Sequence, residues 1–117
     1  MTLESYLEFC LSLPNSQEGF PFDKNTLVLK VGGKMFALFD AELFDFINLK
    51  CDPQEAVELR EQYMGISEGY HMNKKHWITV QLHGDVEDAL ILELTKKSYH
   101  LVFQTLSKKV RDEFALR

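Results

Sequence analysis

The stretch from residue 26 to residue 40 constrains the fold more than any other part of the chain. Residues 26–31 alternate with a period of two, which is typical of a β-strand, and the apolar set is Leu27, Leu29 and Val31. Gly32 and Gly33 follow at once, and a Gly-Gly pair supplies the positive φ angles of a tight hairpin turn. Residues 34–40 return as a second strand. The sequence therefore predicts an antiparallel hairpin.

Two further segments show a strand pattern. Residues 44–51 predict a third strand, with Phe44, Phe46 and Asn48 on one side and Ile47, Leu49 and Cys51 on the other. A fourth strand is predicted at residues 77–82, where Ile78, Val80 and Leu82 alternate with Trp77, Thr79 and Gln81. Trp77 is thus expected on the sheet face opposite Ile78 and Val80. Gly84 and Asp85 end this strand.

Helical spacing marks the remaining segments. The first helix carries one apolar stripe and takes Thr2 as its N-cap, and the stripe is Leu3, Tyr6, Leu7, Cys10 and Leu11. A second helix starts at Asp52, with Pro53 at the first helical position and Glu55 at the third, and runs to about Tyr63. A long helix is predicted over residues 86–104, and a short one follows from Ser107. The inner rows expected in the long helix are Leu90, Leu94 and Leu101, and Ile91, Ser98 and Val102.

The predicted order is α-β-β-β-α-β-α-α, with hairpin-length connections among the first strands. This order indicates an α+β fold in which helices pack on an antiparallel β-sheet. The 117 residues fit a single domain spanning residues 1–117, because no repeat or linker divides them.

Charge is divided unevenly along the chain, whose formal net charge is −5. Residues 1–69 hold 5 basic and 12 acidic side chains, whereas the residues after Gly69 hold 8 basic and 6 acidic side chains and all four histidines. The acidic balance argues against a grip on nucleic acid or anionic membrane by the whole surface. Any such contact is expected to be local and to use the C-terminal half.

Cys10 and Cys51 stand in apolar surroundings and lack the number and spacing of a disulfide framework or a zinc site. We expect both to be buried thiols. The acidic N-terminus is unlike a signal peptide, and no run approaches the roughly 20 apolar residues of a membrane span. These features favour a protein of the reducing cytoplasm.

Residues 69–77, Gly-Tyr-His-Met-Asn-Lys-Lys-His-Trp, form the densest polar, basic and aromatic stretch. The stretch is predicted to be a loop that feeds the fourth strand, and Asn73 tolerates the left-handed backbone that such a bend often needs. Lys74 and Lys75 could contact phosphate while Tyr70 or Trp77 stacks on a base. In the alternative interpretation the lysines are solvated, the histidines orient the loop, and Trp77 is part of the core.

Three blocks carry a resemblance to a known family. They are Gly32-Gly33-Lys34-Met35-Phe36-Ala37 in the hairpin, Asn48-Leu49-Lys50-Cys51 with Asp52-Pro53 after it, and residues 69–77. Through them nearly the whole chain resembles the MmcQ/YjbR family of small bacterial proteins. The resemblance implies a double-wing, CyaY-like α+β fold and a predicted DNA-binding role.

The candidate nucleic-acid-binding face combines the blocks of this resemblance with the stacking ring of Tyr70. Its members are Lys34, Lys50, Tyr70, His71, Asn73, Lys74, Lys75, His76 and Trp77. Sheet geometry could bring Lys34 and Lys50 near the loop. We expect DNA as the partner, a monomer, and no membrane contact. The alternative partner is another protein or a small anionic ligand that uses the same loop.

Other chemistries find less support in the sequence. Metal binding, which the CyaY-like fold brings to mind through frataxin-type iron sites, would use the carboxylates Glu4, Glu8, Glu55, Glu58 and Glu61, or His71 with His76. Carboxylates at helical spacing more often form a solvated face, and the two histidines do not match the spacing of a helical zinc site. No nucleophile elbow, phosphate loop or dinucleotide fingerprint is present. We therefore expect neither a cofactor nor enzyme activity.

Overall fold

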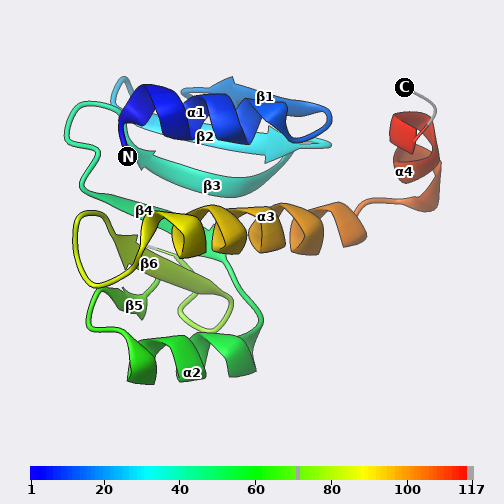
Figure 1. Ribbon diagram of the computed structural model, residues 1–117. Helices are drawn as coiled ribbons and strands as arrows, with labels where there is room; N and C mark the ends of the chain where they lie inside the picture. Colours follow the sequence, from blue (N-terminus) through cyan, green and yellow to red (C-terminus); the bar gives the residue numbers. More distant parts are fainter. Residues whose placement is uncertain (71, 116–117) are drawn as a thin grey trace.

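The computed structural model of this protein describes residues 1–70 and 72–115. Within them, the helices and strands follow one another in the order α1 (Leu3–Ser12), β1 (Ser16–Gly19), β2 (Thr26–Val31), β3 (Lys34–Asp40), β4 (Phe46–Lys50), α2 (Pro53–Gln62), β5 (Ile66–Glu68), β6 (Trp77–Gln81), α3 (Asp88–Gln104) and α4 (Lys108–Ala115). The strands form one antiparallel sheet in the order β1-β2-β3-β4-β6-β5 (Figure 1). The α+β prediction is therefore confirmed.

The hairpin between β2 and β3 turns on the two glycines, as the sequence predicts. Gly32 and Gly33 have φ angles of 58° and 80°, in the region that favours glycine. A side chain at Gly32 would also place its Cβ 2.6 Å from a methyl carbon of Leu106, which packs under the turn. The turn thus needs glycine for its backbone and for its contact with the segment that follows α3.

A β-bulge at Phe36 interrupts the pairing of β2 with β3. The register passes from Leu29 opposite Ala37 to Lys30 opposite Met35, so Phe36 is the extra residue. Phe36 and Ala37 are both fully buried in the main core. The hydroxyl of Ser98, on α3, donates to the Phe36 carbonyl and accepts from the Lys50 backbone N–H at 2.9 Å. A buried side chain therefore bridges β3 and β4 beside the bulge.

The helices α1 and α2 begin at the N-caps that the sequence predicts. The Thr2 side chain accepts from the Ser5 N–H and forms a capping box with it. The Asp52 carboxylate accepts from the backbone N–H groups of Gln54 and Glu55, at 3.1 and 3.2 Å. The long helix α3 starts at Asp88, two residues later than predicted, and its N-cap Glu87 makes no side-chain hydrogen bond.

Three predictions about local structure are wrong. The four predicted strands do not include the segments of β1 and β5, but these segments form short edge strands of four and three residues. Phe44 does not belong to a strand, because its backbone is left-handed and its ring packs against Tyr6 and Phe39 in the main core. Leu101 is exposed, and Thr95 and Tyr99 are among the buried residues of α3 instead.

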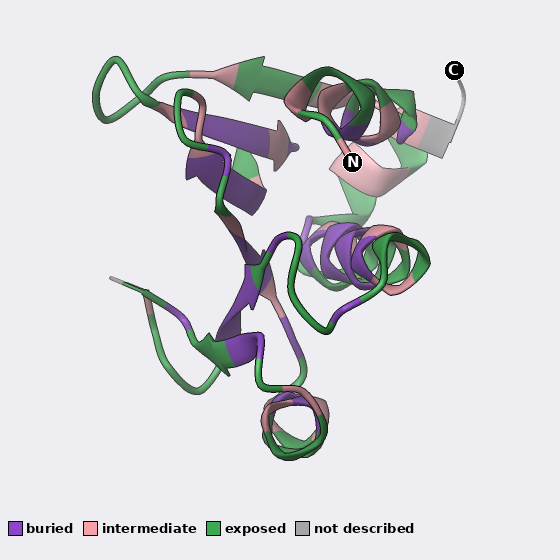
Figure 2. Ribbon diagram, turned by 60° about the vertical axis from the view of Figure 1, so that its left-hand side comes forward, coloured by how far each residue is buried: buried purple, intermediate pink, exposed green. Residues whose placement is uncertain are grey.

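The helices cover one face of the sheet. The main core lies between them and the strands, and its largest fully buried side chains include Tyr6, Phe36, Phe39, Ile47, Leu49 and Ile78. In Figure 2 the buried surfaces of α1 and α3 are turned toward the strands, and both helices lie to the same side of them. We call the opposite side of the sheet the open face. In the described part of the chain, no helix is long and apolar enough to span a membrane.

Candidate functional site

Alternation along the strands sends a second set of side chains to the open face. One row crosses five strands, and its members are Val28, Leu38, Asn48, Thr79 and Ser67. Trp77 lies on the same face, as predicted, and packs with Val28 and Leu38 in a small cluster separate from the main core. The open face is therefore partly apolar although no helix covers it.

A hollow of about 380 Å³ lies on this face, and we call it the open-face hollow. Met35 and Leu38 of β3 and Asn48 of β4 lie among the strand residues that line it. Tyr70 and Met72, from the loop before β6, and Phe22 with Asp23, from the loop before β2, line it from outside the sheet. The sheet thus supplies a rigid floor, and two connecting loops supply the walls.

Asn48 and Thr79 form a buried polar pair at this floor. The Thr79 hydroxyl lies 2.7 Å from the Asn48 Oδ1 and 3.0 Å from the Glu68 carbonyl, and it accepts from the Tyr70 N–H at 2.9 Å. Asn48 is only 5% exposed, and its amide nitrogen has no hydrogen-bond partner among the described residues. This nitrogen is a donor that a ligand or a water molecule in the hollow could use.

Aromatic side chains surround this polar pair. Phe46 lines the hollow from β4. The rings of Tyr70 and Phe46 pack edge to face, with their centroids 5.9 Å apart. Tyr70 and Phe22 are 58% and 63% exposed, so both present ring surface to solvent. Exposed rings that lie together at one hollow are candidates for contact with a ligand.

The loop before β6 is held by its own backbone contacts. The Gly69 N–H donates to the Trp77 carbonyl, and a Cβ at Gly69 would lie 2.6 Å from the Trp77 Cβ. The Asn73 Oδ1 accepts from the N–H groups of Lys75 and His76, at 2.9 and 3.2 Å. Asn73 is not among the residues with a positive φ, so it shapes the bend as a side-chain acceptor and not through a left-handed backbone.

The nine predicted site residues are only partly brought together. Lys50, Tyr70 and Trp77 belong to the open face or its loop, and Asn73, Lys74, Lys75 and His76 are exposed in that loop. Lys34 is on the other side, where its Nζ lies 3.2 Å from the Thr105 hydroxyl at the end of α3. His71 lies outside the described residues. The nine residues therefore do not form one continuous surface.

The chemistry of the described loop residues is also uneven. Trp77 is 8% exposed, so Tyr70 is the ring that a ligand can reach. The Lys74 ammonium lies 3.9 Å from the Glu68 carboxylate.

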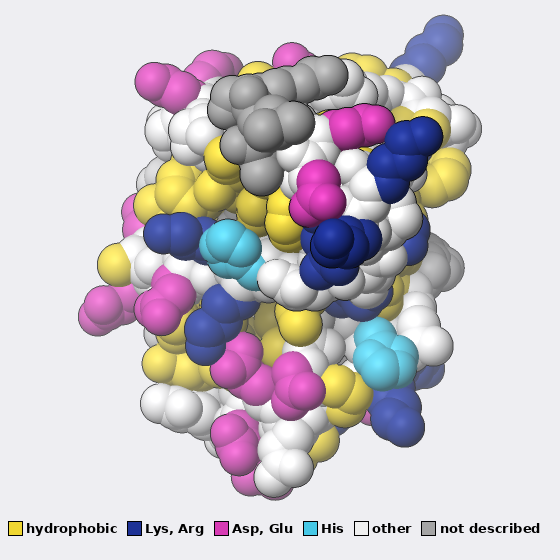
Figure 3. All heavy atoms as spheres, turned by 90° about the vertical axis from the view of Figure 1, so that its right-hand side faces the viewer, with side chains coloured by type: hydrophobic (Ala, Val, Ile, Leu, Met, Phe, Trp, Pro, Cys, Tyr) yellow, Lys and Arg dark blue, Asp and Glu magenta, His cyan; other side chains and the backbone are white. Residues whose placement is uncertain are grey.

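Figure 3 looks onto the end of the molecule that holds α4, and the lysine and arginine side chains there are separated by aspartate and glutamate. Positive charge on that face is dispersed.

Several residues of the open-face hollow were missed as site candidates. Phe46 and Asn48 were predicted to share one side of a strand, but neither was predicted to have a role in binding. An asparagine in an otherwise apolar strand was the available signal, because a buried amide requires partners. Phe22, Asp23 and Asp40 carried no signal, since only the folded chain brings them to the hollow.

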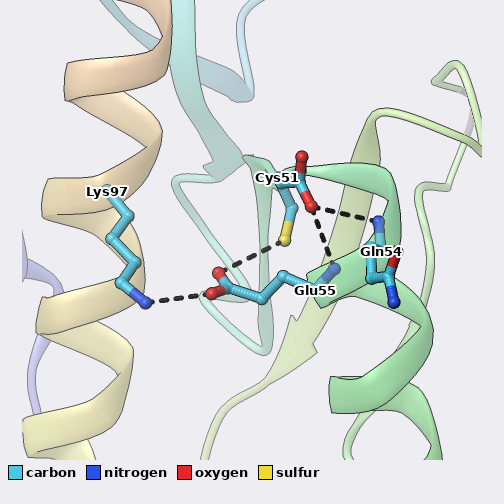
Figure 4. A network of polar contacts seen from close by, with 5 residues as sticks. Cys51, Gln54, Glu55 and Lys97 are labelled. Atoms are coloured by element: carbon cyan, nitrogen blue, oxygen red, sulfur yellow. Dashed lines mark hydrogen bonds and ion pairs between the residues drawn. The ribbon is translucent and has the colours of Figure 1, made fainter.

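Both thiols are buried, as predicted, and among the described residues neither is hydrogen-bonded to a histidine side chain. Figure 4 shows the Cys51 thiol directed at the Glu55 carboxylate, 3.8 Å away, while the Lys97 ammonium bonds the other oxygen of Glu55 at 3.0 Å. Burial, with Glu55 as a second cause, raises the pKa of Cys51 to about 12. A thiol with this pKa is protonated at neutral pH and is a poor nucleophile.

Metal ligands are not clustered in the part of the chain that the structure describes. There, no group of three or more histidine, cysteine, aspartate or glutamate side chains lies close enough to hold an ion. The carboxylates considered for metal binding are mostly exposed on α1 and α2, and Glu55 is bound by Lys97.

Comparison with known proteins places the chain among bacterial relatives. The YjbR family model matches residues 11–101. The uncharacterized protein YbdF of Escherichia coli O157:H7 is 41% identical over 108 residues, which is 91% of this chain and 88% of YbdF. The uncharacterized protein YjbR of Escherichia coli K12 is 30% identical over 112 residues, 95% of each chain. The crystal structure of Deinococcus radiodurans DR2400, with a DUF419 domain, is similar with a TM-score of 0.92 and 42% identity, over 99% of this chain and 89% of that one.

Proposed function

The chain belongs to the YjbR family, and from this premise we propose that it is a small, monomeric binding module without enzyme activity, whose ligand site is the open-face hollow. The observation that carries the proposal is the hollow itself. Its volume of about 380 Å³ falls in the range of small-molecule sites, which are mostly apolar with a few well-placed polar groups.

The arrangement of the hollow supports a recognition site more than a catalytic one. Apolar and aromatic side chains provide contact area, and the Asn48 amide provides a polar group at the floor. Cys51 is not among the residues that line the hollow, and its thiol is protonated at neutral pH. The two edge strands are short, and each carries an exposed glutamate, which discourages pairing between copies of the sheet and supports a monomer.

Ligand mapping by NMR tests this proposal. We expect fragments from a small library to shift the amide signals of Leu38, Asn48 and Met72 more than those of α2. Tyr70→Ala should weaken such fragments by roughly tenfold, because it removes a ring from the wall. Leu43→Ala is the matched control, since Leu43 is exposed but does not line the hollow. If no fragment perturbs the open face of the folded protein, the proposal is wrong.

Nucleic-acid binding is the second candidate, and the exposed loop lysines favour it. Lys74 and Lys75 lie in the loop beside the hollow, and Lys50 lies on the open face next to Trp77 in the neighbouring strand. Tyr70 is exposed and could stack on an unpaired base. If about four lysines contact phosphate, the logarithm of the binding constant should fall with that of the salt concentration at a slope of about −3.6.

Charge reversal distinguishes this candidate from the first. We expect the double change Lys74→Glu and Lys75→Glu to weaken DNA binding in fluorescence anisotropy at low salt, with thermal stability unchanged. The same reversal at Lys108 and Lys109, two exposed lysines on α4, is the control with equal net charge. Negligible binding by the unmodified protein, or equal losses in the two variants, would exclude a DNA-binding role for the loop.

A further inference from the structure

We propose that the open-face hollow selects a small organic cation, a ligand with an alkylammonium head and a hydrogen-bonding group a few atoms away. This inference rests on the proposed function, because it names the chemical class of ligand for the same site. Three independent features of the lining carry it: its formal charge, its aromatic rings and its buried amide.

The formal charges that line the hollow, within the described residues, are all negative. They belong to Asp23, before β2, and to Asp40, at the end of β3. Asp40 uses Oδ1 to accept from the N–H groups of Glu42 and Leu43, at 2.8 and 2.9 Å. Its Oδ2 accepts no hydrogen bond from the described residues, so this oxygen is available to a cation.

Asp23 is held as a carboxylate by its own turn. Its oxygens accept from the Asn25 and Thr26 N–H groups and from the Thr26 hydroxyl. The backbone bonds from Thr26 and then Asn25 lower the pKa of Asp23. The carboxylate is therefore charged at neutral pH, and it favours a cation at this end of the hollow.

The rings around the hollow suit the same kind of group. Phe22, Phe46 and Tyr70 all line it, and the perpendicular packing of Tyr70 on Phe46 gives walls in two orientations. An alkylammonium is attracted to the negative face of an aromatic ring, most strongly where water is partly excluded. The thioethers of Met35 and Met72 add polarizable surface that adapts to the shape of the ligand.

The buried amide defines the other end of the ligand. Asn48 lies opposite Leu38, which is two residues before Asp40 in β3. The Asn48 nitrogen can donate to an oxygen of the ligand. Lys30 and Lys50 lie on the open face beyond Met35, one strand to either side of β3. Neither lysine lines the hollow, so the ammonium is expected at Asp23 and Asp40 and the oxygen toward Asn48.

Trp77 provides a direct readout of occupancy. It is the single tryptophan of the chain, and it packs with Leu38, Met35 and Met72, which all line the hollow. The experiment titrates the full chain with three probes of equal shape and different charge: choline, the neutral 3,3-dimethylbutan-1-ol and the anionic 3,3-dimethylbutanoate. Trp77 fluorescence and amide chemical shifts are both recorded.

Choline should bind at least about tenfold more tightly than the neutral alcohol, and the anion should bind least. Asp40→Asn keeps an oxygen for the two backbone N–H groups but removes the charge, so it should weaken choline about fivefold and leave the alcohol unchanged. Tyr70→Leu should also weaken choline selectively. Glu58→Gln, the same loss of charge on the exposed face of α2, should change neither probe.

The outcomes separate this inference from the proposed function. Equal binding of choline and the alcohol, tighter binding of the anion, or an unchanged preference in Asp40→Asn would overturn the cation assignment while leaving a ligand site in the hollow. Absence of any response to all three probes, with no open-face shifts in the fragment screen, would overturn both.

Discussion

Cys10 and Cys51 are kept protonated by the environment that folding gives them. Cys10 is fully buried and Cys51 is 4% exposed. Burial raises the pKa of each thiol from 9.0 to about 12, and Glu55 contributes at Cys51. Because the unfolded chain releases these protons first, the stability linked to them is fully present below pH 9 and decreases as the pH rises from 9 toward 12.

The double variant Cys10→Ala, Cys51→Ala should therefore lose less stability than the unmodified protein between pH 8 and pH 10. Between pH 8 and pH 10 the unmodified protein should lose about 1.4 kcal/mol more of its free energy of unfolding per thiol than the variant. This loss arises over the one pH unit above the unfolded pKa of 9.0. Urea unfolding under reducing conditions at the two pH values measures it. Tyr99, whose pKa burial also raises, is present in both proteins and cancels in the comparison. Tyr6 does not cancel fully, because Cys10 contributes to its raised pKa after burial, so removal of Cys10 also changes the titration of Tyr6. Identical pH dependence in the two proteins would contradict the account.

Single residues also mark how far the sequence alone can define a site. Trp77 was correctly assigned to the open face, because alternation along a strand fixes the side from which a residue projects. Its burial agrees with the alternative interpretation of the loop and depends on Val28 and Leu38, from strands far away in sequence. The same limit applies to Asp40, which reaches the hollow only through the register of β3.

A single carboxylate, Asp85, connects the segment after β6 with the turn between α2 and β5, although the sequence indicated only that it ends a strand. Asp85, in the segment between β6 and α3, accepts from the N–H groups of Met64 and Gly65 at 2.7 and 2.8 Å. A Cβ at Gly65 would lie 2.8 Å from one of these oxygens, so glycine permits the approach. The contact fixes the turn that carries the chain from α2 into β5.

Asp85→Ala should destabilise the protein by about 2 kcal/mol, because the exposed Met64 N–H and the partly buried Gly65 N–H both lose a charged acceptor. Glu87→Gln, two residues further on, is the control, since Glu87 makes no side-chain cap bond. Chemical denaturation measures both changes. If the two variants were equally stable, Asp85 would have no role in holding the turn.

Elements with strong local signals were predicted well. The Gly-Gly hairpin and the caps of α1 and α2 depend on contacts within a few residues, and these are readable from sequence. The strands β1 and β5 were missed because four and three residues cannot show a clear alternation, and both exist through pairing with a neighbouring strand. Phe44 was misassigned because its ring fits the alternation, whereas aromatic packing with Tyr6 decides its position.

At the scale of the whole molecule, the two faces of one sheet have different tasks. All the large buried side chains of the main core lie on the side of the helices, so stability depends mainly on that side. Polar groups such as Asn48 and exposed rings such as Tyr70 can therefore lie on the open face, because they do not belong to the main core. Alternation in the sequence predicted which strand residues share a face, whereas the hollow depends on the placement of two loops.

The bridge made by Ser98 has a consequence for hydrogen exchange. The Lys50 N–H lies beside the bulge of β3, where its direct pairing with the Phe36 carbonyl is replaced by the Ser98 hydroxyl. Both groups are enclosed under α3, so deuterium should reach this amide only when the helix lifts from the sheet. The Lys50 amide is thus expected to report the opening of α3, although it belongs to a strand.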